Sequence, residues 1–164
     1  CTSPFPYDGI FRRAVLNFKF HNCGAYAELL SHEMVRSIKD VYRDREFDLV
    51  TCVPMHKDTL RKRGYNQAEL LAKECASLLG IEYADLLAKT KKNKTQHSIK
   101  AAERVKNVIG VYSPIDKNLI KGKRILIIDD IITTGSTLGE CARILNKCKC
   151  GEICCCTLCT SLLI

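Results

Sequence analysis

Apolar side chains recur every three or four positions in four stretches of the chain, which is the period of an amphipathic helix. In the second stretch, a single stripe runs through Leu30, Met34, Ile38 and Val41. In the third, Gly80 stands just after the last apolar residue, where a glycine commonly ends a helix. The pattern therefore predicts helices over residues 10–20, 25–42, 66–79 and 136–147.

Three short apolar runs lie between or after these helices, at residues 48–53, 124–129 and 153–158. Their apolar residues do not alternate with polar ones, which is typical of parallel strands that are buried on both faces. A shorter run at residues 110–113 is a fourth candidate strand. Because strands alternate with helices, we predict an α/β fold with a mostly parallel central sheet flanked by helices. The 164 residues fit one domain, residues 1–164, without repeat or linker.

The charge of the chain narrows the class of ligand. The net charge is +8 and the pI is about 9.0. This excess suits a phosphorylated small molecule or a nucleic acid, although a solvated basic face would give the same composition. Residues 89–106 hold seven basic residues and one acidic residue, which favours an exposed loop, either a mobile segment or a plain surface loop.

The cysteines bear on metal binding and on the cellular compartment. Six of the 11 lie between residues 148 and 159. Zinc ligands usually converge on turns, whereas Cys154 and Cys155 lie in a predicted strand and would point to opposite faces. We therefore expect small buried thiols and no zinc site. No apolar run approaches the roughly 20 residues that span a bilayer, and no secretory leader is visible, so we expect a cytoplasmic protein without membrane insertion.

One segment has a chemistry that can be interpreted directly. Two adjacent carboxylates, Asp129 and Asp130, end a buried strand and precede a small polar loop of Thr133, Thr134, Gly135, Ser136 and Thr137. Ligands of parallel sheets bind beyond the carboxyl ends of the strands, where this segment lies. The hydroxyls and the free N–H groups of the following helix form a phosphate cradle. The carboxylates would repel a phosphate but suit ribose hydroxyls or a magnesium ion. The segment thus predicts a site for a 5-phosphoribosyl group.

Other interpretations of this segment fit less well. The chain has no G-x-x-x-x-G-K-[ST] run and no G-x-G-x-x-G run, which are the loops of common nucleotide-binding folds. A phosphatase of the haloacid dehalogenase type would place two aspartates one residue apart, and here they are adjacent. Solvated aspartates followed by an ordinary helix cap remain an alternative, but the five-residue loop is richer than a cap requires.

The segment resembles the phosphoribosyl pyrophosphate (PRPP) signature of type I phosphoribosyltransferases, and the chain is similar to the ComF family within that group. Near the start, Asn17-Phe18-Lys19-Phe20 resembles a lysine–aromatic element of the family. Further on, the family's V-P-x-x…R-x-x-R-G-[FY]-N-Q-A run is matched by Val53-Pro54-Met55-His56 and Arg61-Lys62-Arg63-Gly64-Tyr65-Asn66-Gln67-Ala68. Its Q…R-x-x-N element is matched by Gln96, Arg104 and Asn107. The resemblance covers nearly the whole chain, but many members carry an N-terminal zinc ribbon, which we expect to be absent or truncated here.

The resemblance implies a role for each matched residue. It also implies a small variable hood that recognises the acceptor. Asp129 and Asp130 would hold the ribose hydroxyls, with Mg²⁺ bound through the substrate, and residues 133–137 would hold the 5′-phosphate. The pyrophosphate loop would be Val53, Pro54 and Met55. Beyond it, Arg61 and Arg63 would either make forked phosphate contacts or serve as surface charge. A flexible loop that closes over the substrate would contain Gln96, Arg104 and Asn107.

Two functions follow from this resemblance. The first is a magnesium-dependent phosphoribosyltransferase that transfers the phosphoribosyl group of PRPP to an unidentified acceptor, which we expect to contain nitrogen. The alternative is a non-catalytic protein of competence and DNA uptake, which binds PRPP or single-stranded DNA and has a competence helicase as a candidate partner. Aromatic residues make up only 7% of the chain, and none interleaves residues 89–106 as a platform for stacking bases would. His56 and His97 stay open as acid–base groups or as solvated side chains.

Overall fold

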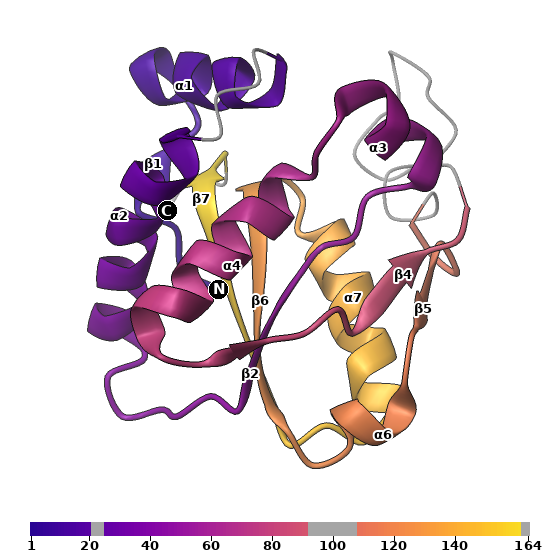
Figure 1. Ribbon diagram of the computed structural model, residues 1–164. Coiled ribbons are helices and arrows are strands. Elements are labelled where there is room, and N and C mark those ends of the chain that lie inside the picture. Colours follow the sequence, from indigo (N-terminus) through magenta and orange to yellow (C-terminus); the bar gives the residue numbers. More distant parts are fainter. Residues whose placement is uncertain (21–24, 92–107, 162–164) are drawn as a thin grey trace.

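A computed structural model shows the fold (Figure 1) and describes residues 1–20, 25–91 and 108–161. Within these ranges the helices are α1 (Gly9–Phe20), α2 (Ala25–Val41), α3 (Lys57–Arg63), α4 (Gln67–Leu79), α6 (Lys117–Ile120) and α7 (Ser136–Lys147). The strands are β1 (Phe5–Pro6), β2 (Leu49–Cys52), β3 (Glu82–Tyr83), β4 (Leu87–Lys89), β5 (Tyr112–Pro114), β6 (Arg124–Ile132) and β7 (Glu152–Thr160).

Five strands form one parallel sheet in the order β1-β7-β6-β2-β3, which confirms the predicted α/β fold. The strand that carries the acid pair, β6, lies in the middle, where Ile128 pairs with Cys52 of β2 and with Cys156 of β7. Strands β4 and β5 form a separate antiparallel hairpin. Figure 1 shows α2 and α4 on one face of the sheet and α7 on the other.

The apolar core has two halves, one on each face of the sheet. Leu126 and Ile128 pack with residues of α2 and α4, whereas Ile125 and Ile127 pack with residues of α7. All four side chains are fully buried, which explains why the apolar residues of this strand do not alternate with polar ones. In β7, Cys154 and Cys156 belong to the first half and Cys155 contacts the second, so neighbouring thiols point to opposite faces, as predicted.

The structure extends the predicted elements in several places. The strand predicted to end at Asp129 continues to Ile132, because its pairing with β7 carries on through Thr160. The strand predicted at residues 110–113 is β5, two residues later, and its partner β4 was not predicted. Neither was α3, a short helix without a buried residue, nor the two-residue strands β1 and β3. These elements are too short to show a hydrophobic period.

The carboxyl ends of β2, β6 and β7 meet at one edge of the sheet because the strands are parallel. Helices α1 and α3 stand at this edge, at the top of Figure 1, and so does the start of α7. The resemblance implies a small hood, and α1 lies at the edge where such a cover would stand. In the described part of the chain, no helix is long and apolar enough to cross a membrane.

Candidate functional site

The two adjacent carboxylates lie in the last part of β6, at the edge where ligands of parallel sheets bind. The backbone N–H of Asp130 donates to the Asp129 carboxylate over 2.8 Å. The carboxylate of Asp130 forms an ion pair with Lys19, with 2.9 Å between Nζ and Oδ2. Burial, followed by the charge of Asp130, raises the pKa of Asp129 to about 8. Asp129 therefore keeps its proton to a higher pH than an exposed aspartate does.

The loop after the acid pair turns directly into the first turn of α7. Gly135 has a φ of +73° and stands at the N-cap, where it has no side chain to accept the N–H groups of the helix. The hydroxyls of Thr134 and Ser136 lie 2.7 Å apart, and Thr133 and Thr134 are exposed. Asp129 and residues 131–138 line a hollow of ≈ 30 Å³, so any ligand larger than one small group must extend beyond it. This arrangement is suited to an anion.

The predicted pyrophosphate loop begins beside the acid pair. The N–H of Val53 donates to the carbonyl of Ile128 over 3.0 Å, so the loop leaves β2 next to Asp129. The side-chain amide of Asn66 donates to the carbonyl of Val53 over 3.1 Å and fixes the start of the loop. Pro54 and Met55 follow and are half-buried. Two predicted site segments that are far apart in the sequence thus meet at one edge of the sheet.

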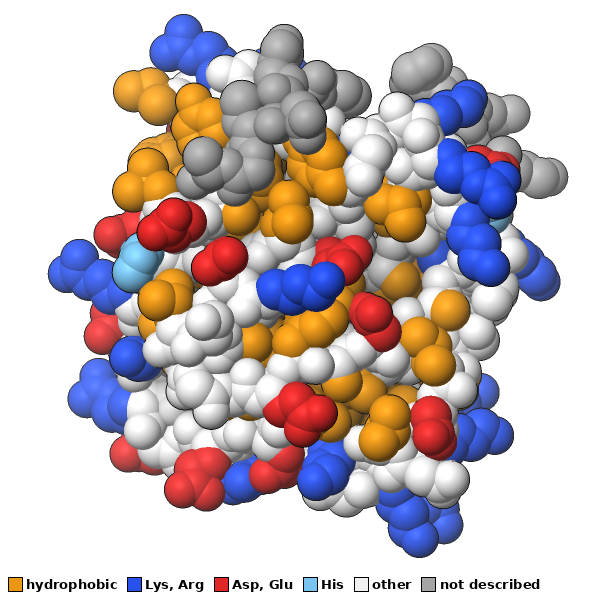
Figure 2. Space-filling model, viewed as in Figure 1, with side chains coloured by type: hydrophobic (Ala, Val, Ile, Leu, Met, Phe, Trp, Pro, Cys, Tyr) orange, Lys and Arg blue, Asp and Glu red, His pale blue; other side chains and the backbone are white. Residues whose placement is uncertain are grey.

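The predicted phosphate-binding arginines lie on α3, just beyond this loop. Arg61 is exposed, whereas Arg63 is half-buried and donates to Oε1 of Gln67 over 2.8 Å. Figure 2 shows Lys and Arg side chains gathered at the upper right, where α3 lies. His56 is the N-cap of this helix, and its Nδ1 accepts the N–H of Asp58 over 3.2 Å. This contact gives His56 a structural role.

The run from Arg63 to Gln67 joins α1, α3, α4 and the pyrophosphate loop. Gly64 ends α3 with a φ of +87°, and Asn66 caps α4 by accepting the N–H of Ala68. The hydroxyl of Tyr65 donates to the carbonyl of Phe18. The buried Gln67 side chain donates to the carbonyl of Lys19 over 3.4 Å. The contacts of this run therefore hold the end of α1 at the site.

Sequence reasoning did not assign two lysines to the site. Lys19 contacts Asp130, as described above. Lys89 ends β4, and its Nζ lies 5.5 Å from the ring centre of Tyr112. Burial lowers the pKa of Lys89, and the charge of Asp129 opposes this shift. The available signals were the lysine–aromatic element for Lys19 and, for Lys89, its place at the start of the basic run.

Three predicted site residues lie outside the described residues, namely Gln96, Arg104 and Asn107, and so does His97. Their roles stay predictions.

The described residues fit a metal that is held mainly by the substrate. Among them, no group of three or more His, Cys, Asp and Glu side chains could hold a metal ion. Asp129 and Asp130 together offer two half-buried carboxylates at the carboxyl edge of the sheet. Magnesium commonly binds through one or two carboxylates and keeps waters and phosphate oxygens as its other ligands. This donor set is therefore compatible with Mg²⁺ that arrives with a phosphorylated ligand.

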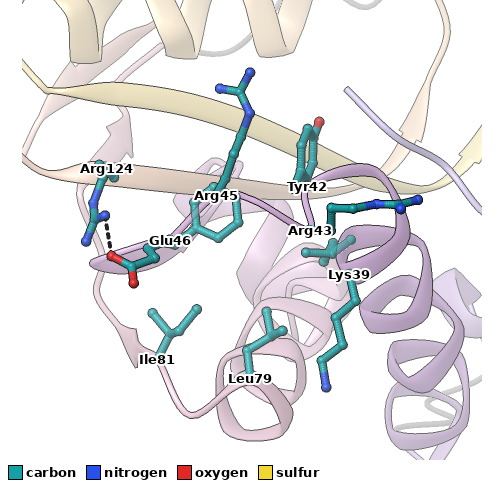
Figure 3. A pocket seen from close by; sticks show the side chains of 10 residues that line it. Lys39, Tyr42, Arg43, Arg45, Glu46, Leu79, Ile81 and Arg124 are labelled. Atoms are coloured by element: carbon teal, nitrogen blue, oxygen red, sulfur yellow. Dashed lines mark hydrogen bonds and ion pairs between the residues drawn. The ribbon is translucent and has the colours of Figure 1, made fainter.

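A second, larger cavity lies at the opposite edge of the sheet (Figure 3). Its volume is ≈ 520 Å³, and Tyr42, Leu79, Ile81 and Arg124 are among the residues that line it. Arg124 begins β6 and contacts Glu46 over 2.8 Å, as the dashed line in Figure 3 marks. Because this cavity faces the amino ends of the strands, the edge with the acid pair remains the candidate site.

Comparison with known proteins identifies the class. The chain matches the model of the phosphoribosyl transferase domain family over residues 65–162, and it belongs to that family. It is 31% identical to Competence protein F of Haemophilus influenzae over 144 residues, which cover 85% of this chain and 63% of that protein. It is 30% identical to Competence protein ComFC of Bacillus subtilis over 152 residues, which cover 92% of this chain and 60% of that protein. The predicted resemblance to the ComF family is thus confirmed.

The chain spans a little over half the length of these two relatives, 63% and 60%. Among solved structures, it is similar to the glutamine PRPP amidotransferase of Bacillus subtilis, in a complex with ADP and GMP. That similarity has a TM-score of 0.54 and 21% identity, and covers 80% of this chain and 26% of that one. It confirms the type I phosphoribosyltransferase fold.

Proposed function

We propose that this chain is a magnesium-dependent phosphoribosyltransferase, which binds PRPP and transfers its phosphoribosyl group to a nitrogen-containing acceptor. One observation carries the proposal. Asp129 and Asp130 stand at the carboxyl end of the central strand, directly before the loop of residues 133–137 that begins α7. Membership of the phosphoribosyl transferase domain family supports the same conclusion.

In this proposal the loop and the acid pair divide the ligand between them. The hydroxyls of Thr133, Thr134 and Ser136 and the first N–H groups of α7 donate to the 5′-phosphate, which also meets the positive end of the helix dipole. Asp129 and Asp130 accept hydrogen bonds from the 2′- and 3′-hydroxyls of the ribose. The ligand is then held at both ends of the hollow that Asp129 and residues 131–138 line.

The proposed reaction replaces one bond at the anomeric carbon with another. The bond to the pyrophosphate oxygen breaks, and its electron pair leaves with pyrophosphate, while an acceptor nitrogen forms the new bond to carbon and loses its proton. Mg²⁺, when bound, neutralises part of the charge on the departing group. The loop at Val53, Pro54 and Met55 orients the pyrophosphate beside the acid pair. Positioning and electrostatic stabilisation supply most of the rate, and no covalent nucleophile is needed.

Calorimetry with PRPP, with and without Mg²⁺, tests the ligand. We expect binding by the wild-type chain to require Mg²⁺, and Asp130→Ala to weaken it about tenfold or more because a charged hydrogen bond is lost. The matched control is Asp44→Ala, which should bind like wild type. Asp44 is exposed and stands between Arg43 and Arg45, which line the cavity at the opposite edge of the sheet. If the wild-type chain does not bind PRPP even with Mg²⁺, the proposal is wrong. If it binds, release of pyrophosphate is then measured against a panel of amines and nucleobases.

A second candidate function is a non-catalytic protein that binds PRPP or single-stranded DNA. Arg61 and Lys62 are exposed on α3 beside the candidate site, and two similar proteins are named as competence proteins. Anisotropy of a labelled single-stranded oligonucleotide should then fall steeply between about 50 mM and about 200 mM salt, because phosphate contacts release counterions. Arg61→Glu with Lys62→Glu should abolish that binding. Absence of salt-dependent binding would eliminate DNA as the ligand.

A further inference from the structure

Lys19 reaches the acid pair from the other end of the sequence. Its Nζ lies 2.9 Å from Oδ2 of Asp130, and only 21% of the lysine side chain and 15% of the aspartate side chain are exposed. The pair is therefore partly withdrawn from water, where a charge-assisted contact is stronger than at an open surface. An ammonium group has three N–H donors, and Asp130 is the one carboxylate that Lys19 pairs with among the described residues.

The backbone around Lys19 is held in place by residues next to the pyrophosphate loop. Phe18 is fully buried, and its carbonyl accepts from Tyr65. The rings of Phe18 and Tyr65 also pack, with 6.2 Å between their centres. The backbone carbonyl of Lys19 accepts from the side-chain amide of Gln67. The side-chain oxygen Oε1 of Gln67 in turn accepts from Arg63 over 2.8 Å. These contacts fix the last turn of α1, and the fold therefore directs the side chain of Lys19 at Asp130.

We propose that Lys19 is a ligand-contact residue of the phosphoribosyl site, and that Tyr65 and Gln67 are positioning residues that act through it. The inference rests on the proposed function and adds a residue to the site. Two adjacent carboxylates would repel a polyanion such as PRPP. Lys19 cancels the charge of Asp130 and keeps N–H donors for oxygens of the ligand that lies on the pair. It therefore makes an acidic pair compatible with an anionic ligand.

The competing explanation is that Lys19 only stabilises the ligand-free fold as the counterion of Asp130. The two explanations differ in what a lysine substitution changes. A structural counterion would alter thermal stability and leave the affinity of the folded protein for PRPP unchanged. A ligand-contact residue would alter that affinity in the folded protein, and a second cation at the same place would restore it.

Calorimetry with PRPP at saturating Mg²⁺ separates these cases. We expect Lys19→Met to weaken binding about 10- to 100-fold, the range for loss of a hydrogen bond between charged groups. Lys19→Arg should recover most of the affinity. The matched control is Lys39→Met, a lysine on α2 that lines the cavity at the opposite edge of the sheet and should leave the affinity unchanged. Thermal melting of each variant confirms that it is folded.

The positioning residues are tested by a double-mutant cycle. Tyr65→Phe removes only the hydroxyl that holds Phe18, and we expect it to weaken PRPP binding severalfold in the wild-type background. In the Lys19→Met background, the same change should have no further effect, because the side chain it positions is gone. Fully additive effects would show that Tyr65 does not act through Lys19 and would overturn the positioning role.

The outcomes also distinguish this inference from the proposed function. If wild-type protein and Lys19→Met bind PRPP equally well, Lys19 is not a contact residue and only this inference is overturned. If the wild-type chain does not bind PRPP at all with Mg²⁺, both are overturned. Loss of affinity in Lys19→Met that Lys19→Arg restores supports both.

Discussion

The environment of Asp129 differs strongly from that of an exposed aspartate in water. Burial and the neighbouring Asp130 raise its pKa to about 8, whereas an unfolded aspartate has a pKa of about 3.9. Between these values the folded protein keeps a proton that the unfolded chain has released. The stability contributed by this group is therefore present below about pH 4 and is lost as the pH rises towards 8.

Asp129→Asn should remove this pH dependence. Without divalent metal, we expect the free energy of unfolding of the variant to gain on that of wild type from about pH 5 to about pH 8, by at most ~1.4 kcal/mol per pH unit. Urea denaturation across this range measures it. The control is Asp44→Asn, an exposed residue whose curve should run parallel to wild type. Parallel curves for Asp129→Asn as well would show that Asp129 ionises normally.

The cysteines give a second prediction for single residues. Burial raises the pKa of Cys52 and that of Cys75 to about 12, so both thiols are protonated and shielded at neutral pH. Cys1 is exposed. In a Cys23→Ser background, we expect a thiol reagent at about pH 7.5 to modify Cys1 rapidly and these buried thiols only after denaturant is added. Rapid modification of Cys75 in the native protein would contradict this burial.

At the scale of single residues, the sequence allowed part of the candidate site to be predicted. Asp129, Asp130 and residues 133–137 are contiguous, so their order alone indicated a phosphoribosyl site. Lys19 and Lys89 belong to segments more than a hundred and about forty residues earlier, and only folding brings them near the pair. Because sequence order does not say which lysine meets which carboxylate, these two could not be assigned from the pattern.

At the scale of elements, the junction between β6 and α7 depends on Gly135. Its φ of +73° lies in the left-handed region, where a Cβ is unfavourable, although the added atom would meet only Ile132 at 3.8 Å. We expect Gly135→Ala to cost about 1–2 kcal/mol, to lower Tm by a few degrees and to weaken PRPP binding. Calorimetry and thermal melting measure both effects.

Gly139 in the same helix is the matched control. It has no positive φ, and nothing lies within 4 Å of the Cβ it would gain. Gly139→Ala should therefore raise stability by up to about 1 kcal/mol, because alanine favours a helix over glycine. Equal losses at both positions would mean that the conformation of Gly135 is not the cause.

Element length decided which elements could be predicted. Helices α1, α2, α4 and α7 have 12 to 17 residues, enough for a complete apolar stripe, and each was predicted to within one residue at either end. Helix α3 has seven residues, none of them buried, so its sequence shows charge without a period. The hairpin of β4 and β5 depends on pairing between segments about 25 residues apart, which no local pattern reveals.

At the scale of the whole molecule, stability depends on the central strand. Ile127 is fully buried against residues of α7. We expect Ile127→Ala to lower the free energy of unfolding by about 2–5 kcal/mol, through lost burial and the cavity left behind. Urea denaturation measures it. Leu119→Ala, at a leucine that is 50% exposed, should change stability by no more than about 0.5 kcal/mol. Similar losses for both would contradict the assignment of the core.

The order of strands in the sheet has a consequence for how the chain folds. Leu49 of β2 pairs with Ile125 of β6, and Phe5 of β1 pairs with Cys159 of β7. On a ribosome, β1 and β2 therefore emerge long before their partners β7 and β6, and their apolar surface stays unburied until those strands appear. Such distant pairings close large loops and slow folding. We therefore expect the nascent chain to keep apolar surface exposed until β7 has left the exit tunnel.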